Sequence, residues 1–113
     1  MVLPEVIIVL GTVPLVEYGT TGTEELYGNI SKYVDDYDAF LLANHGVVTL
    51  GKSALDAYHK METVEHAAKI QFISNQLGNV NTLAKKQSSK LIALRENFGI
   101  KKNVGFPNSK KPK

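Results

Sequence analysis

The sequence predicts an α/β protein in which helices cover both faces of a central, largely antiparallel sheet. Two observations carry this prediction. Short apolar or β-branched runs alternate with longer segments of helical periodicity, and turn-forming glycines separate many of them. Strands and helices in such an order bury their apolar sides by packing in layers, as an α/β/α domain. A chain of 113 residues fits one domain of this kind.

The first third of the chain is expected to contain two strands, a loop and a helix. Residues 5–10 form an uninterrupted, mostly β-branched run, which predicts a strand. Residues 12–18 predict a weaker strand, and Pro14 favours an edge or a turn because proline donates no ladder hydrogen bond. After a loop, Thr23 is suited to cap a helix that reaches about Tyr37. The expected buried face of this helix is Leu26, Ile30, Tyr33 and Val34.

The remainder of the chain predicts a hairpin and two helices. Strands are expected over Ala39–Ala43 and Val47–Leu50. Ser53 is suited to cap the longest helix, from about Ala54 to Leu77, which a glycine stops. A last helix is expected from about Thr82 to Asn97. The side chains predicted to face the core from these two helices are Leu55, Tyr58, Met61, Val64, Ala68, Ile73, Leu83, Leu91, Ile92 and Leu94.

The charge distribution argues against a nucleic-acid partner. Five of the thirteen basic residues follow Ile100, so residues 1–100 carry eight basic and eleven acidic residues and a formal charge of −3. The basic excess belongs to residues 101–113, which we expect to be a Lys-rich flexible tail. No basic face with interleaved aromatic residues supports binding to nucleic acid.

The composition also sets the expected compartment. The chain contains no cysteine, no secretory signal and no apolar stretch long enough to span a bilayer. Its hydrophobic content of 43% is that of an ordinary globular protein. We therefore expect a cytoplasmic protein without a membrane partner.

His45 is the strongest candidate for a functional residue. It lies between the apolar run that ends at Ala43 and the strand-like run that begins at Val47. A histidine at the end of a buried strand, followed by a glycine that allows a sharp turn, is well placed to bind a metal. We expect Asn44 and Gly46 to shape its loop. The alternative is a histidine that only hydrogen-bonds at the end of a strand.

Three weaker candidates have plain structural alternatives. His59, Glu62 and His66 share roughly one helical face, but two turns separate the histidines by about 10 Å, so a solvated face is favoured over a metal site. The loop Gly19–Thr23 could hold a phosphate at the start of a helix, although it lacks the lysine of a P-loop and a plain turn is favoured. Glu65 could face inward and orient a metal ligand, or it is a polar residue at the edge of a helix face.

Several motifs occur in an order and spacing that match one protein family. They are Val13-Pro14 with Tyr18, Gly22-Thr23-Glu24-Glu25-Leu26, Leu41-Leu42-Ala43-Asn44-His45-Gly46-Val47-Val48, Ala57, and Val64-Glu65. On these motifs residues 3–72 resemble the C-terminal half of class II aldolases of the fuculose-phosphate aldolase type. The same superfamily holds ribulose-phosphate 4-epimerases and the adducin head domain. The resemblance implies a class II aldolase-like fold, truncated at its N-terminus, with residues 1–100 as its C-terminal portion.

The resemblance also implies a metal-dependent enzyme. In the family, three histidines hold a divalent metal, usually zinc, and the third of them corresponds to His45. The family chemistry is reversible aldol cleavage of a sugar phosphate to dihydroxyacetone phosphate and an aldehyde, with the metal as Lewis acid. The complete enzyme is expected to be a homotetramer with active sites between subunits.

The match leaves out part of the family's active site. The His-x-His pair that supplies the other two ligands, and the catalytic glutamate, lie upstream of the matching segment. One imidazole cannot hold a catalytic zinc, which takes three protein ligands. We therefore expect this chain alone to contain no catalytic residue, to bind no metal tightly and to be inactive. A fragment of a full aldolase is favoured over a separate half that pairs with another chain.

Two other functions stay open at the level of the sequence. A ribulose-phosphate 4-epimerase would use the same metal-enolate chemistry to cleave and rejoin a bond. An adducin-like module would use the scaffold for protein interaction, without catalysis. A His-x-His pair upstream of Met1 would support an enzyme, and its absence would support the interaction module.

Overall fold

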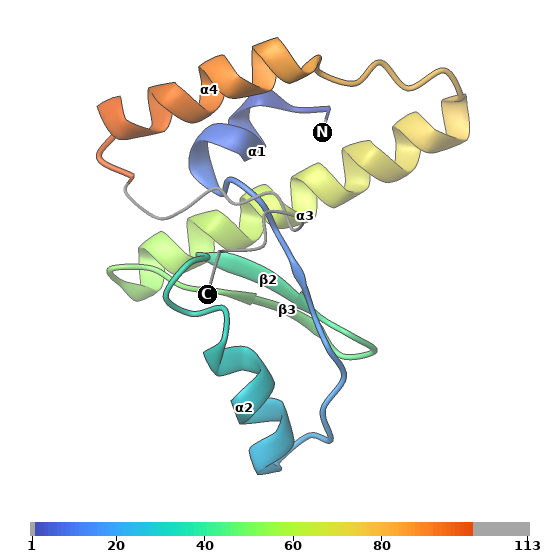
Figure 1. The fold of residues 1–113 in the computed structure, drawn as a ribbon. Helices are drawn as coiled ribbons and strands as arrows, with labels where there is room; N and C mark the ends of the chain where they lie inside the picture. Colours follow the sequence, from blue (N-terminus) through green and yellow to red (C-terminus); the bar gives the residue numbers. More distant parts are fainter. Residues whose placement is uncertain (1, 101–113) are drawn as a thin grey trace.

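A computed structural model of the protein describes residues 2–100, and the predicted tail at 101–113 lies outside the described residues. In chain order the elements are α1 (Pro4–Val9), β1 (Leu15–Val16), α2 (Glu24–Ser31), β2 (Ala39–Leu42), β3 (Gly46–Thr49), α3 (Ala54–Leu77) and α4 (Lys85–Asn97) (Figure 1). Among residues 2–100, no helix combines the length and the apolarity needed to cross a bilayer.

The sheet is mixed and has the strand order β1-β2-β3. β1 runs parallel to β2, with Val16 opposite Leu42. β2 and β3 form an antiparallel hairpin in which Phe40 lies opposite Val48. The predicted antiparallel pairing therefore holds for the hairpin, whereas the β1–β2 pairing is parallel. The prediction that the segment with Pro14 lies at an edge is confirmed within the described sheet.

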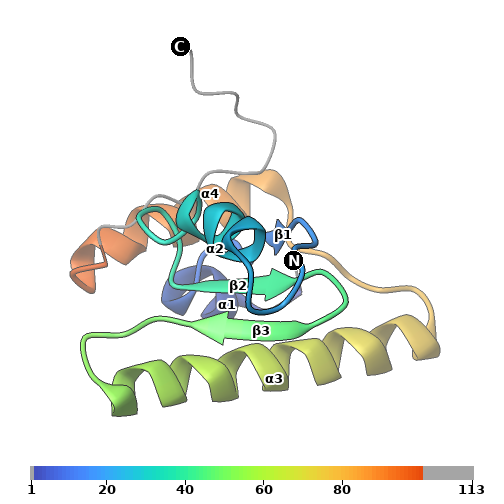
Figure 2. The ribbon, with the colours of Figure 1, turned by 90° about the horizontal axis from the view of Figure 1, so that it is seen from below.

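Helices cover both faces of this sheet, as the sequence predicts. On one face Val16, Phe40 and Leu42 form a buried cluster. The side chains packed against it include those of α2 and the turn that follows, namely Ile30, Tyr33, Val34 and Tyr37. On the other face Ala39 packs with Leu10 and with Val64 of α3. Figure 2 shows the strands between α2 and α3. The α/β/α fold class is confirmed.

The strand predicted for residues 5–10 is wrong, because Pro4–Val9 form the helix α1. Pro4 occupies the first turn, where a helix tolerates proline. Gly11 follows the helix with a φ of 76°, the left-handed conformation that commonly ends helices. Ile7 and Leu10 are buried, so packing decides the conformation of this β-branched run against its local propensity.

The helix α2 is shorter than predicted and ends at Ser31. Residues 32–36 continue as turns, and the N–H of Tyr37 after them donates to Tyr33 O at 2.9 Å. The ring centroids of Tyr33 and Tyr37 lie 5.9 Å apart, and the Tyr33 ring also contacts Phe40. The predicted core side chains of this segment do reach the core, since Leu26 is buried and the other three pack on the sheet.

The boundaries of α3 are confirmed, but its predicted buried face is confirmed only in part. Ser53 Oγ accepts the N–H of Asp56 at 3.1 Å, and the helix ends at Leu77. Val64 is buried under the sheet, whereas Leu55, Tyr58 and Ile73 are exposed. Apolar residues are spread around this helix, and only the part that crosses the sheet can bury them.

The helix α4 begins at Lys85, three residues after the predicted start, and its core differs from the prediction. Leu94 is exposed, whereas the neighbouring Arg95 is the buried residue of this helix. Its guanidinium reaches backbone carbonyls of α1, which no local pattern of apolar residues indicates.

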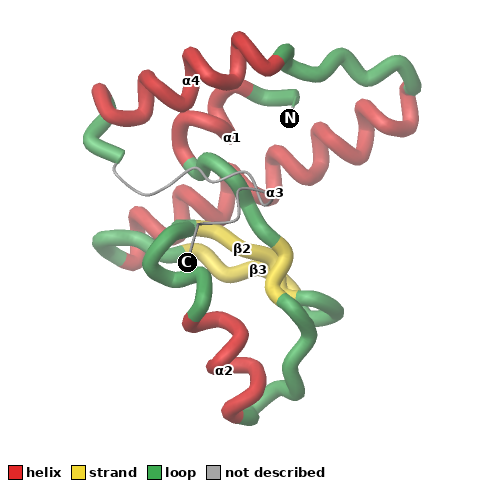
Figure 3. Tube along the Cα trace, viewed as in Figure 1, coloured by secondary structure: helices red, strands yellow, loops and turns green. Residues whose placement is uncertain are grey.

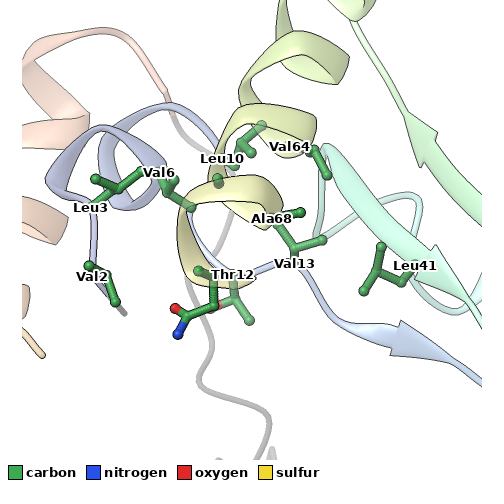
Figure 4. A pocket seen from close by; sticks show the side chains of 11 residues that line it. Val2, Leu3, Val6, Leu10, Thr12, Val13, Leu41, Val64 and Ala68 are labelled. Atoms are coloured by element: carbon green, nitrogen blue, oxygen red, sulfur yellow. The ribbon is translucent and has the colours of Figure 1, made fainter. Parts of the chain in front are cut away.

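An apolar pocket of about 340 Å³ lies between α1, α3 and β2 (Figure 4). Its lining includes Leu3, Val6, Val13, Leu41 and Ala68. The hydroxyl Oγ1 of Thr12 is buried at this pocket without a hydrogen-bond partner. No ionisable side chain lines the pocket within the described part of the chain, so it offers no group for metal or acid–base chemistry.

Candidate metal centre at the ends of two parallel strands

His45 lies at the tip of the β2–β3 hairpin. Its N–H donates to Leu42 O at 3.1 Å, which closes a β-turn between the two strands. Asn44 has a φ of 56°, a left-handed conformation that asparagine tolerates better than most residues. We expected Gly46 to allow the sharp turn, but Gly46 is not among the residues with positive φ. Asn44 therefore shapes the turn, and the His45 side chain is exposed at its end.

The parallel pairing of β1 and β2 brings a second loop to the same edge of the sheet. Val16 O accepts the N–H of Ala43 at 3.1 Å, so the chain leaves both strands side by side. The segment after β1 runs through residues 17–23 to the start of α2, and Figure 3 shows this loop and the hairpin tip leaving the sheet on the same side. Loops that follow parallel strands are the usual location of functional residues in α/β proteins.

A β-turn at Thr20–Thr23 forms the tip of this second loop. The N–H of Thr23 donates to Thr20 O at 3.1 Å, and the Thr23 hydroxyl donates to the same oxygen at 2.6 Å. Gly22 occupies the third position of the turn with a φ of 80°, as a type II turn requires. Thr23 is the N-cap residue of α2 as predicted, but its hydroxyl bonds to the turn rather than to the helix.

Contacts with α2 hold the loop in place. Thr20 N–H donates to Glu25 Oε2 at 3.1 Å, and Asn29 Nδ2 donates to Tyr18 O at 3.1 Å. Gly19 is packed so closely against α2 that an added Cβ would lie 2.6 Å from the Cα of Leu26. The backbone of the loop has little room to shift, so its packing against α2 sets the positions of Thr20 and Thr21.

The two loops meet where Thr21 contacts His45. Thr21 Oγ1 lies 3.4 Å from His45 Nδ1, across 24 positions of sequence. From the sequence, Thr21 was a candidate only as part of the loop Gly19–Thr23, because its proximity to His45 depends on the parallel register of β1 and β2. No local signal in the sequence reports that register.

The other predicted site residues are not part of this cluster. His59, Glu62 and His66 are exposed on α3, which agrees with a solvated face. Tyr58 donates its hydroxyl to Glu62 Oε1 at 3.1 Å, and this bond raises the pKa of Tyr58. Glu65 is also exposed on α3, rather than turned inward beside Val64.

The donor set fits one ligand of a metal, not a complete site. An exposed imidazole whose Nδ1 faces a hydroxyl leaves Nε2 for another partner. Within residues 2–100, no group of three or more histidine, cysteine, aspartate or glutamate residues could hold a metal ion. A zinc bound at His45 would need its other protein ligands from outside the described residues.

The comparison with known proteins decides the family. Residues 2–72 match the profile described as the class II aldolase and adducin N-terminal domain. The chain belongs to this family. The resemblance inferred from the sequence motifs is thus confirmed.

Curated relatives carry two different activities in their names. An L-fuculose phosphate aldolase of Methanococcus maripaludis is 39% identical over 77 residues, which are 68% of this chain and 42% of that protein. A 3-oxo-tetronate 4-phosphate decarboxylase of Escherichia coli K12 is 41% identical over 70 residues, which are 62% of this chain and 33% of that protein. The chain therefore spans less than half the length of these relatives.

Two solved structures of similar proteins superpose on this chain. YgbL of Escherichia coli, described as an aldolase, epimerase or decarboxylase, superposes with a TM-score of 0.73 at 35% identity, over 80% of this chain and 44% of that protein. An L-fuculose 1-phosphate aldolase superposes with a TM-score of 0.70 at 34% identity, over 82% of this chain and 43% of that protein. Both similarities support the class II aldolase fold predicted from the sequence.

Proposed function

We propose that this family member supplies His45 as one ligand of a divalent metal, in an enzyme that cleaves a carbon–carbon bond of a phosphorylated sugar or sugar acid. The observation that carries the proposal is the exposed His45 imidazole at the carboxyl ends of the parallel strands β1 and β2, inside the segment that matches the family. Asn44 sets the turn that projects the imidazole outward. Gly46, the first residue of β3, keeps its proposed role as a loop residue beside His45. The exposed position of Glu65 on α3 does not support the orienting role expected for it.

The reaction we propose is aldol cleavage of fuculose-phosphate type, giving dihydroxyacetone phosphate and an aldehyde. The name of the Methanococcus relative supports this reaction. When bound, a divalent metal supplies Lewis-acid stabilisation of the negative charge that develops on the substrate oxygens. The contribution of this chain is to hold the His45 ring in place. We further propose zinc as the metal, the cytoplasm as the compartment and a homotetramer as the assembly, all on the basis of the resemblance.

Decarboxylation of a sugar-acid phosphate is the second candidate. The Escherichia coli K12 relative named for this reaction is as similar to the chain as the aldolases are. Loss of carbon dioxide beside a ketone and retro-aldol cleavage both leave negative charge next to a carbonyl, so the same metal ligand serves either reaction. The substrate is then determined by residues that the matched segment does not contain.

Chimeric enzymes test the proposal. The 77 matched residues of the Methanococcus maripaludis aldolase are replaced by the corresponding segment of this chain, and the 70 matched residues of the Escherichia coli decarboxylase are replaced in the same way. Release of dihydroxyacetone phosphate and of carbon dioxide reports the two reactions, and metal analysis reports bound zinc.

His45→Ala and the matched control His59→Ala are made in each chimera. We expect His45→Ala to lower turnover by at least about 100-fold and to reduce bound metal, because a first ligand matters more than its supporting residues. His59→Ala, on the exposed face of α3, should change turnover by less than about twofold. A folded His45→Ala chimera that keeps its metal and its turnover would refute the proposal.

A further inference from the structure

The Thr21 hydroxyl and the His45 ring face one another across two loops that are far apart in sequence. The atoms Oγ1 and Nδ1 lie 3.4 Å apart. We propose that Thr21 is a positioning residue that accepts a hydrogen bond from Nδ1–H of His45, so that Nε2 is the nitrogen presented outward. The inference rests on the proposed role of His45 as a metal ligand, and its first test does not require a metal.

The structure fixes the backbone on both sides of this contact. On the His45 side, the hairpin turn is closed by the bond from His45 N–H to Leu42 O. On the Thr21 side, Thr21 is the second residue of the Thr20–Thr23 turn, which two hydrogen bonds to Thr20 O close. Glu25 holds the N–H of Thr20, and Gly19 abuts α2. Because separate hydrogen bonds hold each turn, the two side chains can stay close even though the contact between them is weak.

Each residue lies a few positions beyond the paired ends of two parallel strands. Val16 and Leu42 are register partners, Thr21 follows Val16 by five residues and His45 follows Leu42 by three. The sheet, not a local motif, therefore brings the hydroxyl to the imidazole. The distance of 3.4 Å is long for a hydrogen bond, so we expect the loss of this contact to have a small energetic effect.

The chemical consequence concerns the tautomer of the imidazole. In a neutral histidine one ring nitrogen carries the proton, and the other has the lone pair that binds a metal. A hydroxyl that accepts from Nδ1–H favours the tautomer with a free lone pair on Nε2. Hydrogen-bonded partners of this kind commonly fix the orientation of metal-ligating histidines.

Nitrogen NMR of the full chain tests the tautomer directly. The 15N shifts of the three imidazoles are measured at a pH where all of them are neutral, in wild type and in Thr21→Val, which removes the hydroxyl at nearly constant volume. We expect His45 to show more Nδ1–H tautomer than His59 and His66. Thr21→Val should lower the Nδ1–H to Nε2–H ratio of His45 by about threefold, the effect of a weak exposed hydrogen bond.

Two further variants separate positioning from general damage to the loop. Thr20→Val makes the same chemical change at the adjacent residue, and the His45 ratio should stay at the wild-type value. Thr21→Ser restores a hydroxyl and should restore the ratio. A ratio that is unchanged in Thr21→Val, or that moves toward Nδ1–H, would overturn the inference, since the second result would mean that the hydroxyl donates to Nδ1.

Metal affinity of the aldolase chimera distinguishes this inference from the proposed function. We expect Thr21→Val to weaken zinc binding by up to about threefold, because the apparent affinity follows the fraction of His45 in the tautomer with a free Nε2 lone pair. If His45→Ala abolishes zinc binding and Thr21→Val leaves it unchanged, the positioning role is wrong and the proposed function stands. If neither variant affects zinc, the proposed function fails, and the metal-directed role of Thr21 fails with it.

Discussion

The guanidinium of Arg95 donates from Nη1 to Ile7 O at 2.6 Å, joining two residues that are 88 positions apart. The same nitrogen donates to Ile8 O at 2.9 Å. These carbonyls belong to the last turn of α1, whose final carbonyls have no partner within the helix. Arg95 thus closes the C-terminal end of α1 from α4. Its burial lowers the pKa of the guanidinium, and the charge of Asp38 opposes this effect.

Replacing Arg95 should destabilise the fold. Arg95→Met keeps much of the apolar volume but leaves the Ile7 and Ile8 carbonyls without their donor, and we expect a loss of about 2 kcal/mol in the free energy of unfolding. Lys90→Met, an exposed change on the same helix, should stay within about 0.5 kcal/mol of wild type. Urea unfolding measures both variants. Equal stabilities for the two would show that the Arg95 bonds contribute nothing net.

Two glycines near α2 predict opposite responses to alanine. At Gly19 the new Cβ would lie 2.6 Å from Leu26 Cα, so Gly19→Ala should force the loop or the helix to move and cost about 1–3 kcal/mol. Gly28 lies inside α2 with open space around it, so Gly28→Ala should stabilise the protein by about 0.5–1 kcal/mol. Thermal unfolding compares the two. The close packing of the loop would be disproved by a Gly19→Ala variant as stable as wild type.

We predict that protonation of Asp56 lowers the free energy of unfolding in acid. Its carboxylate accepts the N–H of Lys52 at 2.9 Å and the ammonium of Lys60 at 3.2 Å. The backbone bond first and the Lys60 bond second lower the pKa of Asp56 below its usual 3.8. Since the unfolded chain binds the proton at higher pH than the folded one, this contribution is present at pH values above the usual pKa of 3.8 and is lost as the pH falls through the lowered pKa of the folded protein.

The measurement for Asp56 is urea unfolding at neutral pH and at a series of pH values below 3.8. Asp56→Asn should lower stability at neutral pH and flatten the decline in acid, because the amide carries no charge to lose. A decline in the variant as steep as in wild type would assign the acid sensitivity to other carboxyl groups.

Local patterns predicted the elements whose signals are strong. The helix Ala54–Leu77 follows from Ser53, a long periodic run and a glycine stop, and the hairpin follows from two apolar runs around His45. The prediction for residues 5–10 was wrong because their β-branched side chains suggest a strand. The carbonyl groups at the C-terminal end of α1 are bound by Arg95, which is distant in the sequence. Pro4 and Gly11 mark the two ends of this helix and were the available local signals.

The site residues also differ in whether a local sequence pattern or the strand pairing identifies them. His45 could be singled out from its neighbours in the sequence, because a histidine at the end of an apolar run is a local feature. Thr21 could not, since only the parallel pairing of Val16 with Leu42 brings the two loops together. Both Asn44 and Gly46 were expected to shape the loop, and the left-handed conformation belongs to Asn44, because both residue types suit turns and the sequence alone does not choose between them.

Anomalous diffraction from crystals of the zinc-loaded aldolase chimera locates the metal relative to His45. We expect a zinc peak about 2.0–2.1 Å from His45 Nε2, with Nδ1 turned toward Thr21 and the remaining protein ligands supplied by the Methanococcus portion. A zinc ion fully coordinated without His45 would refute the proposed role of this residue, and a zinc ion bound through Nδ1 would refute the role of Thr21.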